Sequence, residues 1–326
     1  MNLERLSGIS RRDFLKLSAT AGVSLTALGT SPLMGAQQNS DSKRPISVFS
    51  KHLQWLDYED AADIAAEIGF DGLDLTVRPG GHVLPENVEH DLPRAVEAIK
   101  KAGLDTYMFT SGITHPDDEH TEPVLRTASE LGFSHYRTGY LSYKDNMDIM
   151  ESIQSYRPQW RDLMAMNKEF GLHGGYQNHA GARLGGPVWD LYELLDGMDP
   201  EYIGVQYDVR HATVEGGNSW RLGMELVHPF IKTTVIKDFV WDHDYEDDDW
   251  DAQSVPLGDG MVNWDRYWQI ISKFGISGPI SVHYEYDMGG AEHGASEIDI
   301  SRNEFIKKMK RDLNVLKGWL DRYNLA

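Results

Sequence analysis

The sequence has no cysteine among its 326 residues. Disulfide bridges, cysteine-based zinc sites, iron–sulfur clusters and thiol nucleophiles are therefore excluded. Basic residues are also scarce, because 31 Lys and Arg stand against 51 Asp and Glu, and the formal net charge is −20. A surface with this excess of negative charge repels a phosphate backbone, so nucleic acid is not expected as a partner.

Long hydrophobic runs are missing as well. The modestly apolar stretch at residues 17–28 is shorter than the roughly 20 residues that cross a bilayer, so no stable membrane span is expected. It is followed by Pro32 and small residues up to Ala36, and it is preceded by Ser10-Arg11-Arg12-Asp13-Phe14-Leu15-Lys16. This order resembles a twin-arginine export signal. The resemblance implies a signal peptide at residues 1–36 and export of the folded protein to the periplasm, an oxidising compartment that suits a chain without cysteine.

Glycine marks a joint that recurs along the rest of the chain. An amphipathic stretch ends in Gly, one apolar residue follows, and a short β-rich run begins. A glycine just beyond a helix can adopt the left-handed conformation that satisfies the last carbonyls of the helix. The joint is found at Gly69, Gly103, Gly132, Gly171 and Gly275.

Eight apolar or β-branched runs alternate with helical patterns, which favours a parallel sheet closed into a single (β/α)8 TIM barrel of the α/β class over residues 46–326. Residues 37–45 are a polar tether. A doubly wound sheet would need a Gly-rich phosphate turn after the first strand, and residues 50–55 offer none, so no nucleotide cofactor is expected. Residues 241–262 are expected to form a solvated acidic loop. The predicted strands are 46–49, 72–77, 105–109, 135–137, 173–177, 203–207, 233–236 and 280–283, and the helices 58–68, 92–101, 122–131, 156–170, 188–195, 263–274 and 301–323.

The active site of such a barrel lies at the carboxyl ends of its strands. Polar side chains gather at these ends: Arg137 and Tyr140 after the fourth strand, Gln177, Asn178 and His179 after the fifth, Asp208 and His211 after the sixth, Lys237 and Asp238 after the seventh, and Glu285 after the eighth. Aromatic residues are frequent there too, and aromatic rings stack on sugar rings, so a small carbohydrate is the expected ligand. No cluster of basic residues suited to a sugar phosphate is visible in the sequence.

Five short motifs, in a fixed order along the chain, make it resemble the sugar isomerase/epimerase superfamily of xylose isomerase-like barrels. The motifs are Asn178-His179, Asp208-x-x-His211, Lys237-Asp238, Gly258-x-Gly260 and Glu285. The resemblance implies a divalent metal, often manganese, bound by Glu, Asp, His and Glu from strands five to eight. Asp208 and Glu285 stand where two of these ligands belong, whereas Val235 replaces the histidine and Gly185 lies where relatives carry the first glutamate.

Two interpretations of the cation site stay open. A Mn or Mg ion can be bound by Asp208 and Glu285, with His179 and His211 as nitrogen ligands. Alternatively the metal has been lost and Lys237 takes its place, paired with the two carboxylates.

The resemblance implies an exported isomerase, epimerase or lyase that removes a proton next to a carbonyl of a sugar or oxidised sugar derivative. A carbohydrate-binding barrel without catalysis is the first alternative, and a metal-dependent phosphodiesterase of the endonuclease branch is the second. The oligomeric state is left open, homo-oligomers included. The expected catalytic residues are Glu285, Lys237 and Asp208, and the expected substrate contacts are His179, Asn178, His211, Arg137, Tyr140, Gln177 and Asp238.

Overall fold

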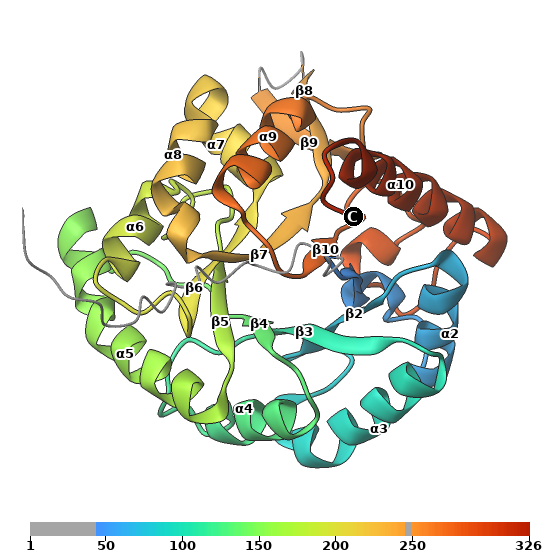
Figure 1. Cartoon of the computed structure of the whole chain (residues 1–326), viewed down its shortest axis with the longest axis horizontal. Helices are drawn as coiled ribbons and strands as arrows, with labels where there is room; N and C mark the ends of the chain where they lie inside the picture. The colour runs from blue at the N-terminus through green and yellow to red at the C-terminus, as the bar shows by residue number, and fades with distance from the viewer. Residues whose placement is uncertain (1–43, 245–248) are drawn as a thin grey trace, which may run out of the picture. The chain divides into compact units, whose positions relative to one another are not determined.

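Eight parallel strands close into a barrel in the computed structural model, which describes residues 44–244 and 249–326. Around the barrel the strands follow the order β1-β10-β7-β6-β5-β4-β3-β2, and β1 also pairs with β2 to close the ring. Helices alternate with the strands and surround the barrel (Figure 1). The predicted (β/α)8 TIM barrel is therefore confirmed.

The barrel strands are β1 (Ile46–Phe49), β2 (Gly72–Val77), β3 (Asp105–Ser111), β4 (His135–Arg137), β5 (His173–Gln177), β6 (Ile203–Asp208), β7 (Ile231–Ile236) and β10 (Ile280–Val282). The helices are α2 (Tyr58–Ile68), α3 (Val88–Lys101), α4 (Thr121–Glu130), α5 (Ile149–Phe170), α6 (Trp189–Leu195), α7 (Val209–Gly216), α8 (Trp220–Val227), α9 (Trp264–Phe274) and α10 (Arg302–Arg322). Short 3-10 turns are η1 (Ser50–Leu53), η2 (Pro85–Asn87), η3 (Gly217–Ser219), η4 (His228–Phe230) and η5 (Ala291–His293).

Local sequence signals explain where the helices begin and end. Asp57 accepts a hydrogen bond from the backbone N–H of Asp60 and so caps the start of α2. Gly69, Gly171 and Gly275 follow α2, α5 and α9 in the left-handed conformation, with φ of 102°, 66° and 62°. The glycine joints predicted from the sequence are therefore confirmed at these helix ends, and each joint turns the chain into the next segment of the barrel.

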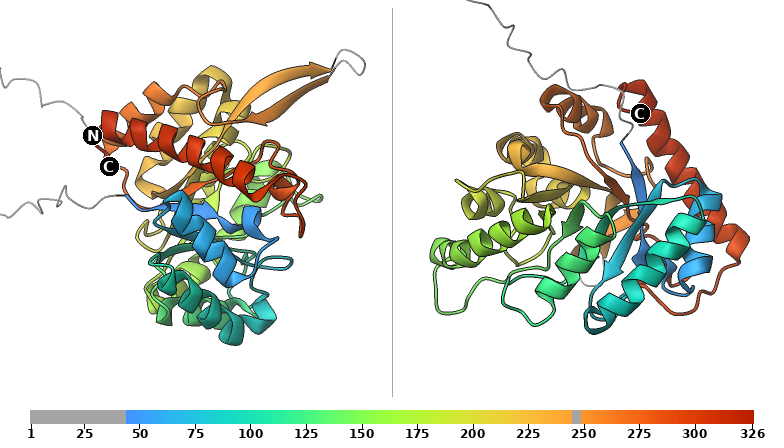
Figure 2. Two further views of the ribbon diagram at one scale, coloured as in Figure 1. Left: turned by 90° about the vertical axis from the view of Figure 1, so that its right-hand side faces the viewer. Right: turned by 60° about the horizontal axis from the view of Figure 1, so that its bottom comes forward.

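The segment between the seventh and eighth barrel strands differs from the prediction. Residues 241–262 were expected to be a solvated loop, but residues 241–244 and 249–255 belong to two antiparallel strands, β8 (Asp238–Asp244) and β9 (Asp249–Val255), paired from Asp238 with Val255 outwards. Figure 2 shows the hairpin extending away from the barrel. Cross-strand pairing outweighs the low strand propensity of its many aspartates. The helices α7 and α8 were also not anticipated.

The predicted signal peptide (residues 1–36) and all but the last two residues of the polar tether (residues 37–45) lie outside the described residues, as do residues 245–248 of the acidic run. Within the part of the chain that the structure describes, none of the helices combines the length and the apolar character that crossing a membrane requires.

A buried carboxyl group ties three strands together inside the barrel. Asp74 on β2 accepts hydrogen bonds from Thr110 Oγ1 on β3 at 2.9 Å and from Ser281 Oγ on β10 at 2.7 Å. Burial raises the pKa of Asp74 above its usual value, and the two hydroxyl donors oppose that shift. Asp74 is fully buried, so its role is to link the three strands inside the barrel and not to contact a ligand from solvent.

Candidate active site

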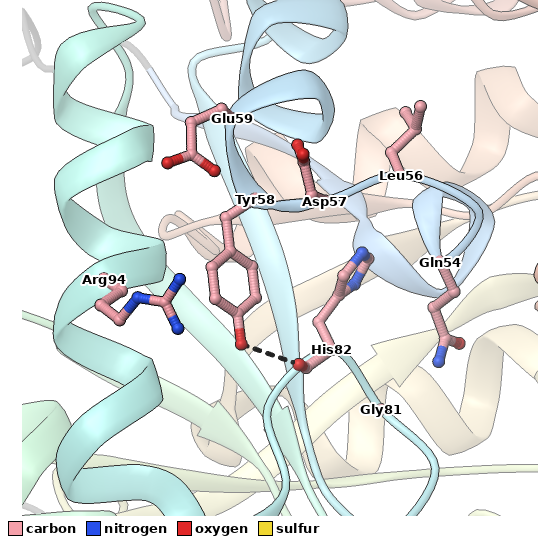
Figure 3. A pocket seen from close by; sticks show the side chains of 8 residues that line it. All are labelled: Gln54, Leu56, Asp57, Tyr58, Glu59, Gly81, His82 and Arg94. Atoms are coloured by element: carbon pink, nitrogen blue, oxygen red, sulfur yellow. Dashed lines mark hydrogen bonds between the residues drawn. The ribbon is translucent and has the colours of Figure 1, made fainter.

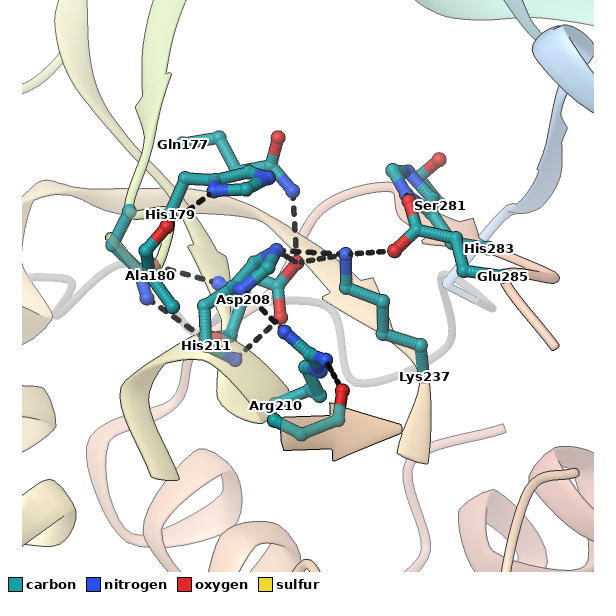
Figure 4. Close-up of polar contacts among 12 residues, drawn as sticks. Gln177, His179, Ala180, Asp208, Arg210, His211, Lys237, Ser281, His283 and Glu285 are labelled. Atoms are coloured by element: carbon teal, nitrogen blue, oxygen red, sulfur yellow. Dashed lines mark hydrogen bonds and ion pairs between the residues drawn. The ribbon is translucent and has the colours of Figure 1, made fainter. Parts of the chain in front are cut away.

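The carboxyl ends of neighbouring strands bring five of the predicted residues into one cluster (Figure 4). Gln177 ends β5, Asp208 ends β6, and Lys237 directly follows β7. His211 lies in the first turn of α7, and Glu285 follows β10. The closure of the barrel alone accounts for this grouping, because parallel strands present their carboxyl ends at one rim.

The ammonium group of Lys237 is the centre of the cluster. Its Nζ atom lies 2.8 Å from Oε2 of Glu285, 3.3 Å from Oδ2 of Asp208 and 2.8 Å from Nε2 of His211. Lys237 and Asp208 are buried, whereas 25% of the Glu285 side chain is exposed. One cation therefore joins two carboxylates, and only the glutamate is open to solvent.

Charge attraction sets the ionisation of this pair. Burial alone lowers the pKa of Lys237, but the attraction of Asp208 and Glu285 outweighs burial and raises that pKa. Burial alone would raise the pKa of Glu285, yet the charge of Lys237 and the neighbouring His283 bring it well below its usual range. At neutral pH the lysine is protonated and the glutamate is ionised.

His211 faces two groups that can only donate. Lys237 contacts its Nε2, and Nη1 of Arg210 lies 3.0 Å from its Nδ1. Burial and the nearby Lys237 lower the pKa of His211 well below its usual value, so the ring is neutral and has a single accepting nitrogen. It can accept from only one of the two cations at a time, which leaves the other with a proton available for an oxygen of a ligand.

A second layer of hydrogen bonds positions Asp208. Gln177 Nε2 donates to Oδ2 of Asp208 at 2.8 Å, while its Oε1 accepts from Arg137 Nη1 at 3.0 Å and from the Tyr140 hydroxyl at 2.5 Å. The Asn178 amide contacts the backbone instead, donating to the Asp208 carbonyl and accepting from its N–H, both at 2.8 Å. Asn178 is thus a positioning residue, and Arg137 and Tyr140 reach the cluster through Gln177.

His179 packs against the cluster and is partly exposed to solvent. Its ring lies against that of His211, with centroids 3.8 Å apart. Its Nδ1 donates to the carbonyl oxygen of Ala180 at 2.9 Å, which leaves Nε2 as an acceptor. The residue is only partly buried, so Nε2 is placed to contact a ligand hydroxyl.

Asp238 is turned away from the cluster. Its carboxylate accepts from Trp264 Nε1 at 2.8 Å and from the backbone N–H groups of Gly258, Gly260 and Val262 at 3.1, 3.3 and 3.2 Å. These donors occupy the accepting positions of the carboxylate. The loop also packs closely against it, because a Cβ atom on Gly260 would lie 2.1 Å from Oδ1 of Asp238. Asp238 therefore anchors the loop between β9 and α9, which corrects its predicted place among the substrate contacts.

The predicted metal ligands Asp208, Glu285, His179 and His211 do lie near one another, but Lys237 Nζ stands between three of them. A divalent ion bound to the same atoms would lie in contact with the ammonium group, and like charges repel strongly in a buried site. Among the described residues, no three His, Asp or Glu side chains are grouped so that they could hold a metal ion. The residues present therefore do not fit a divalent metal.

Three residues at the ends of β1 and β10 join the site although the sequence did not single them out for it. Lys51 Nζ lies 3.5 Å from Glu285 Oε1, and His283 Nδ1 lies 3.6 Å from the same atom. The His283 ring stacks on Phe49 with a centroid distance of 4.3 Å. His283 and Glu285 are two residues apart, the spacing at which side chains of an extended segment lie on the same side, and both reach the cluster. The position of Lys51 just after the first strand was the signal that could have pointed to it.

A separate pocket of about 400 Å³ lies beside α2 and α3 (Figure 3). Tyr58 donates to the His82 carbonyl there at 3.1 Å, and the His82 ring contacts Ser50 Oγ and the Leu53 carbonyl, both at 3.1 Å. Both ring nitrogens of His82 are thus engaged within the fold. None of the cluster residues around Lys237 lines this pocket.

Residues 62–309 match the sequence profile of the family described as xylose isomerase-like TIM barrels. The chain belongs to this family. A search of curated proteins finds no match by sequence.

Solved structures agree on the fold. The IOLI protein with a bound zinc atom is 14% identical, with a TM-score of 0.63, over 84% of this chain and 99% of that one. The 3-keto-D-glucoside 4-epimerase of Escherichia coli is 12% identical, with a TM-score of 0.60, over 85% and 100%. The D-allulose 3-epimerase of Methylomonas sp. in complex with D-allulose is 14% identical, with a TM-score of 0.60, over 85% and 98%. Sugar epimerases thus stand among the similar structures, and at these identities the likeness establishes the fold.

The role of Asp238 as a loop anchor predicts the behaviour of Asp238→Asn. Its amide would present hydrogens to backbone N–H groups that need an acceptor, so the free energy of unfolding should fall by about 2–4 kcal/mol. Urea unfolding measures this change. Asp117→Asn, whose side chain is 89% exposed, is the matched control and should change stability by less than about 0.5 kcal/mol. Unchanged stability of Asp238→Asn together with weakened ligand binding would restore Asp238 to the substrate contacts.

Proposed function

We propose that this barrel is an enzyme that removes a proton next to the carbonyl group of a sugar or oxidised sugar derivative. One observation carries the proposal: a protonated lysine and an ionised, partly exposed glutamate stand 2.8 Å apart at the carboxyl rim of the barrel. A cation that stabilises an oxyanion and a carboxylate that accepts a proton are the two groups such a reaction needs.

In the proposed reaction, Glu285 takes the proton from the carbon next to the carbonyl. The electron pair of the broken C–H bond forms a carbon–carbon double bond, and the carbonyl electrons move to its oxygen, giving an enolate. Lys237 donates a hydrogen bond to that oxygen and stabilises its charge. Return of the proton to the former carbonyl carbon, with transfer of the neighbouring hydroxyl proton to the enolate oxygen, gives isomerisation. Protonation of the opposite face of the original carbon gives epimerisation. Transfer of the proton from Glu285 to a β-hydroxyl group, which leaves as water while the carbonyl re-forms, gives elimination.

The surrounding residues support these two groups. The charge of Asp208 keeps Lys237 protonated and holds its ammonium group in place. The Gln177 amide donates to the Asp208 carboxylate and fixes its orientation. His179 offers Nε2 to a substrate hydroxyl. His211 accepts from Lys237 or Arg210, which leaves the other cation with a proton for a substrate oxygen. Lys237 supplies the positive charge that a divalent metal would supply in the other interpretation of the cation site, so no metal enters the proposed reaction.

A carbohydrate-binding barrel without catalysis is the second candidate, favoured by the loss of two ligand positions to Val235 and Gly185. The phosphodiesterase alternative receives no support, because the described residues contain no cluster of metal ligands for it.

Solvent exchange tests the proposal directly. Chelator-treated protein is incubated in D2O with a panel of keto sugars, and proton NMR follows the loss of the hydrogen next to the carbonyl. We expect exchange by the wild type and a fall of about 10²-fold or more for Glu285→Gln and for Lys237→Met. Lys100→Met, an exposed residue on α3, should exchange like the wild type.

Each alternative has its own outcome in this experiment. Sugar binding without exchange would identify the binding barrel. Exchange that disappears on chelation and returns with Mn would refute the role of Lys237.

We also propose that the protein is exported through the twin-arginine pathway to the periplasm, on the order of residues 10–16 and the apolar run that follows. The full chain should fractionate with the periplasm of a host that has this pathway. Changing Arg11 and Arg12 to lysine should retain it in the cytoplasm, whereas Arg5→Lys should not. Equal periplasmic amounts of all three proteins would contradict the proposal.

A further inference from the structure

Three cations surround one aromatic ring at the rim of the barrel. The Phe49 ring at the end of β1 has Lys51 Nζ at 5.8 Å, the Arg78 guanidinium at 5.5 Å and the Arg137 guanidinium at 5.6 Å from its centroid. These cations follow β1, β2 and β4, far apart in the sequence. The sequence shows no basic cluster because these residues lie far apart along the chain, and the closed barrel brings them together.

Carboxylates neutralise these cations only in part, since Lys51 pairs with Glu285 and the two arginines have no such contact. Arg78 and Arg137 form no ion pair with any described residue, and Arg137 Nε is buried without a hydrogen-bond partner. The charge of Asp74 acts on Arg78 and Arg137 without an ion-pair contact, and its oxygens accept from Thr110 and Ser281. Glu285 pairs with Lys237 as well as with Lys51. A largely buried cluster with more positive charges than carboxylates in contact with them is unfavourable unless an anion joins it.

The cations also act on one another. Burial lowers the pKa of Arg78, and the charge of Arg137 lowers it further. Burial lowers the pKa of Lys51, and the charges of Lys237 and Arg78 act in the same direction. A second aromatic ring extends the cluster, because the Arg137 and Arg183 guanidinium groups lie 5.3 and 5.2 Å from the centroid of Tyr140.

The cluster is continuous with the proposed reaction site. Lys51 contacts Glu285, and His283, which stacks on Phe49, lies 3.6 Å from the same carboxylate. Lys51, Arg78 and Tyr140 are partly exposed, as Glu285 is, so a ligand in solvent can contact this cluster as well as Glu285. A neutral sugar would use hydroxyl and amide partners, whereas planar guanidinium groups match an oxyanion.

We infer that the substrate is an anionic sugar derivative whose carboxylate or phosphate group is bound by Arg78, Arg137 and Lys51 while its carbonyl group faces Lys237. This inference rests on the proposed function and narrows its substrate class. The shared chemistry is an oxyanion at one end of a keto sugar.

Three ligands that differ only at C6 test the inference: D-fructose, D-fructuronate and D-fructose 6-phosphate. Isothermal titration calorimetry of the full chain should show at least one of the two anions binding about tenfold or more tightly than D-fructose at low salt, with the difference shrinking as salt screens the cations. Binding of fructuronate alone identifies a sugar acid, and binding of the phosphate alone identifies a sugar phosphate.

Arg78→Gln should remove most of the preference for the anion, because the residue is partly exposed and its loss leaves the barrel intact. Arg94→Gln, an exposed arginine on α3, is the matched control and should bind like the wild type. Equal affinity for all three sugars, no binding of either anion, or an unchanged preference in Arg78→Gln would overturn the inference.

The outcome separates this inference from the proposed function. Anion binding that depends on Arg78, without solvent exchange next to the carbonyl, would leave the inference standing and remove the proposed reaction. Exchange of neutral keto sugars that is unchanged in Arg78→Gln would support the proposed reaction and refute the inference of an anionic substrate.

Discussion

The structure of the site depends on one ion-pair arrangement, the Lys237 ammonium group between Asp208 and Glu285. A buried carboxylate without a partner is strongly unfavourable, so Asp208 requires a cation at this place whatever the chemistry of the enzyme. Because the lysine is part of the chain, that cation is always present and its distance from Glu285 is set by the ends of β7 and β10. Gln177, Asn178 and the backbone N–H of His211 form hydrogen bonds with Asp208 and hold it in position.

This arrangement gives the rim of the barrel two neighbouring regions of different electrostatic character. Around Lys237, two carboxylates share one ammonium group and Lys51 adds a second positive charge at Glu285, which suits proton transfer beside a developing oxyanion. Around Phe49, Arg78 and Arg137 have no carboxylate partner among the described residues, and Lys51 shares Glu285 with Lys237, which suits the binding of an anion. The acidic residues that dominate the net charge are mostly found elsewhere, for example on the hairpin of β8 and β9.

Much of the fold could be predicted because each barrel strand is a short apolar run and each helix carries its own amphipathic pattern and glycine end. The hairpin could not, since its aspartates hide a strand pattern that only cross-strand pairing stabilises. Within the site, Asp208, Lys237 and Glu285 were predictable from their places at strand ends. Asp238 shares such a place, yet the adjacent backbone turns its carboxylate towards the loop of Gly258 and Gly260. Lys51 and Arg78 also follow strand ends but were not assigned to the site, because their partners around Phe49 and Glu285 come from strands distant in the sequence.

The central claim is that the Lys237 ammonium group occupies the cation position of the site, and Mn²⁺ binding followed by electron paramagnetic resonance tests it most directly. Wild-type protein should leave the Mn²⁺ signal free, because Nζ stands among Asp208, His211 and Glu285. Lys237→Ala should gain one bound Mn²⁺, because it frees two carboxylates and an imidazole as ligands. One tightly bound Mn²⁺ in the wild type, lost on Glu285→Gln, would contradict the account.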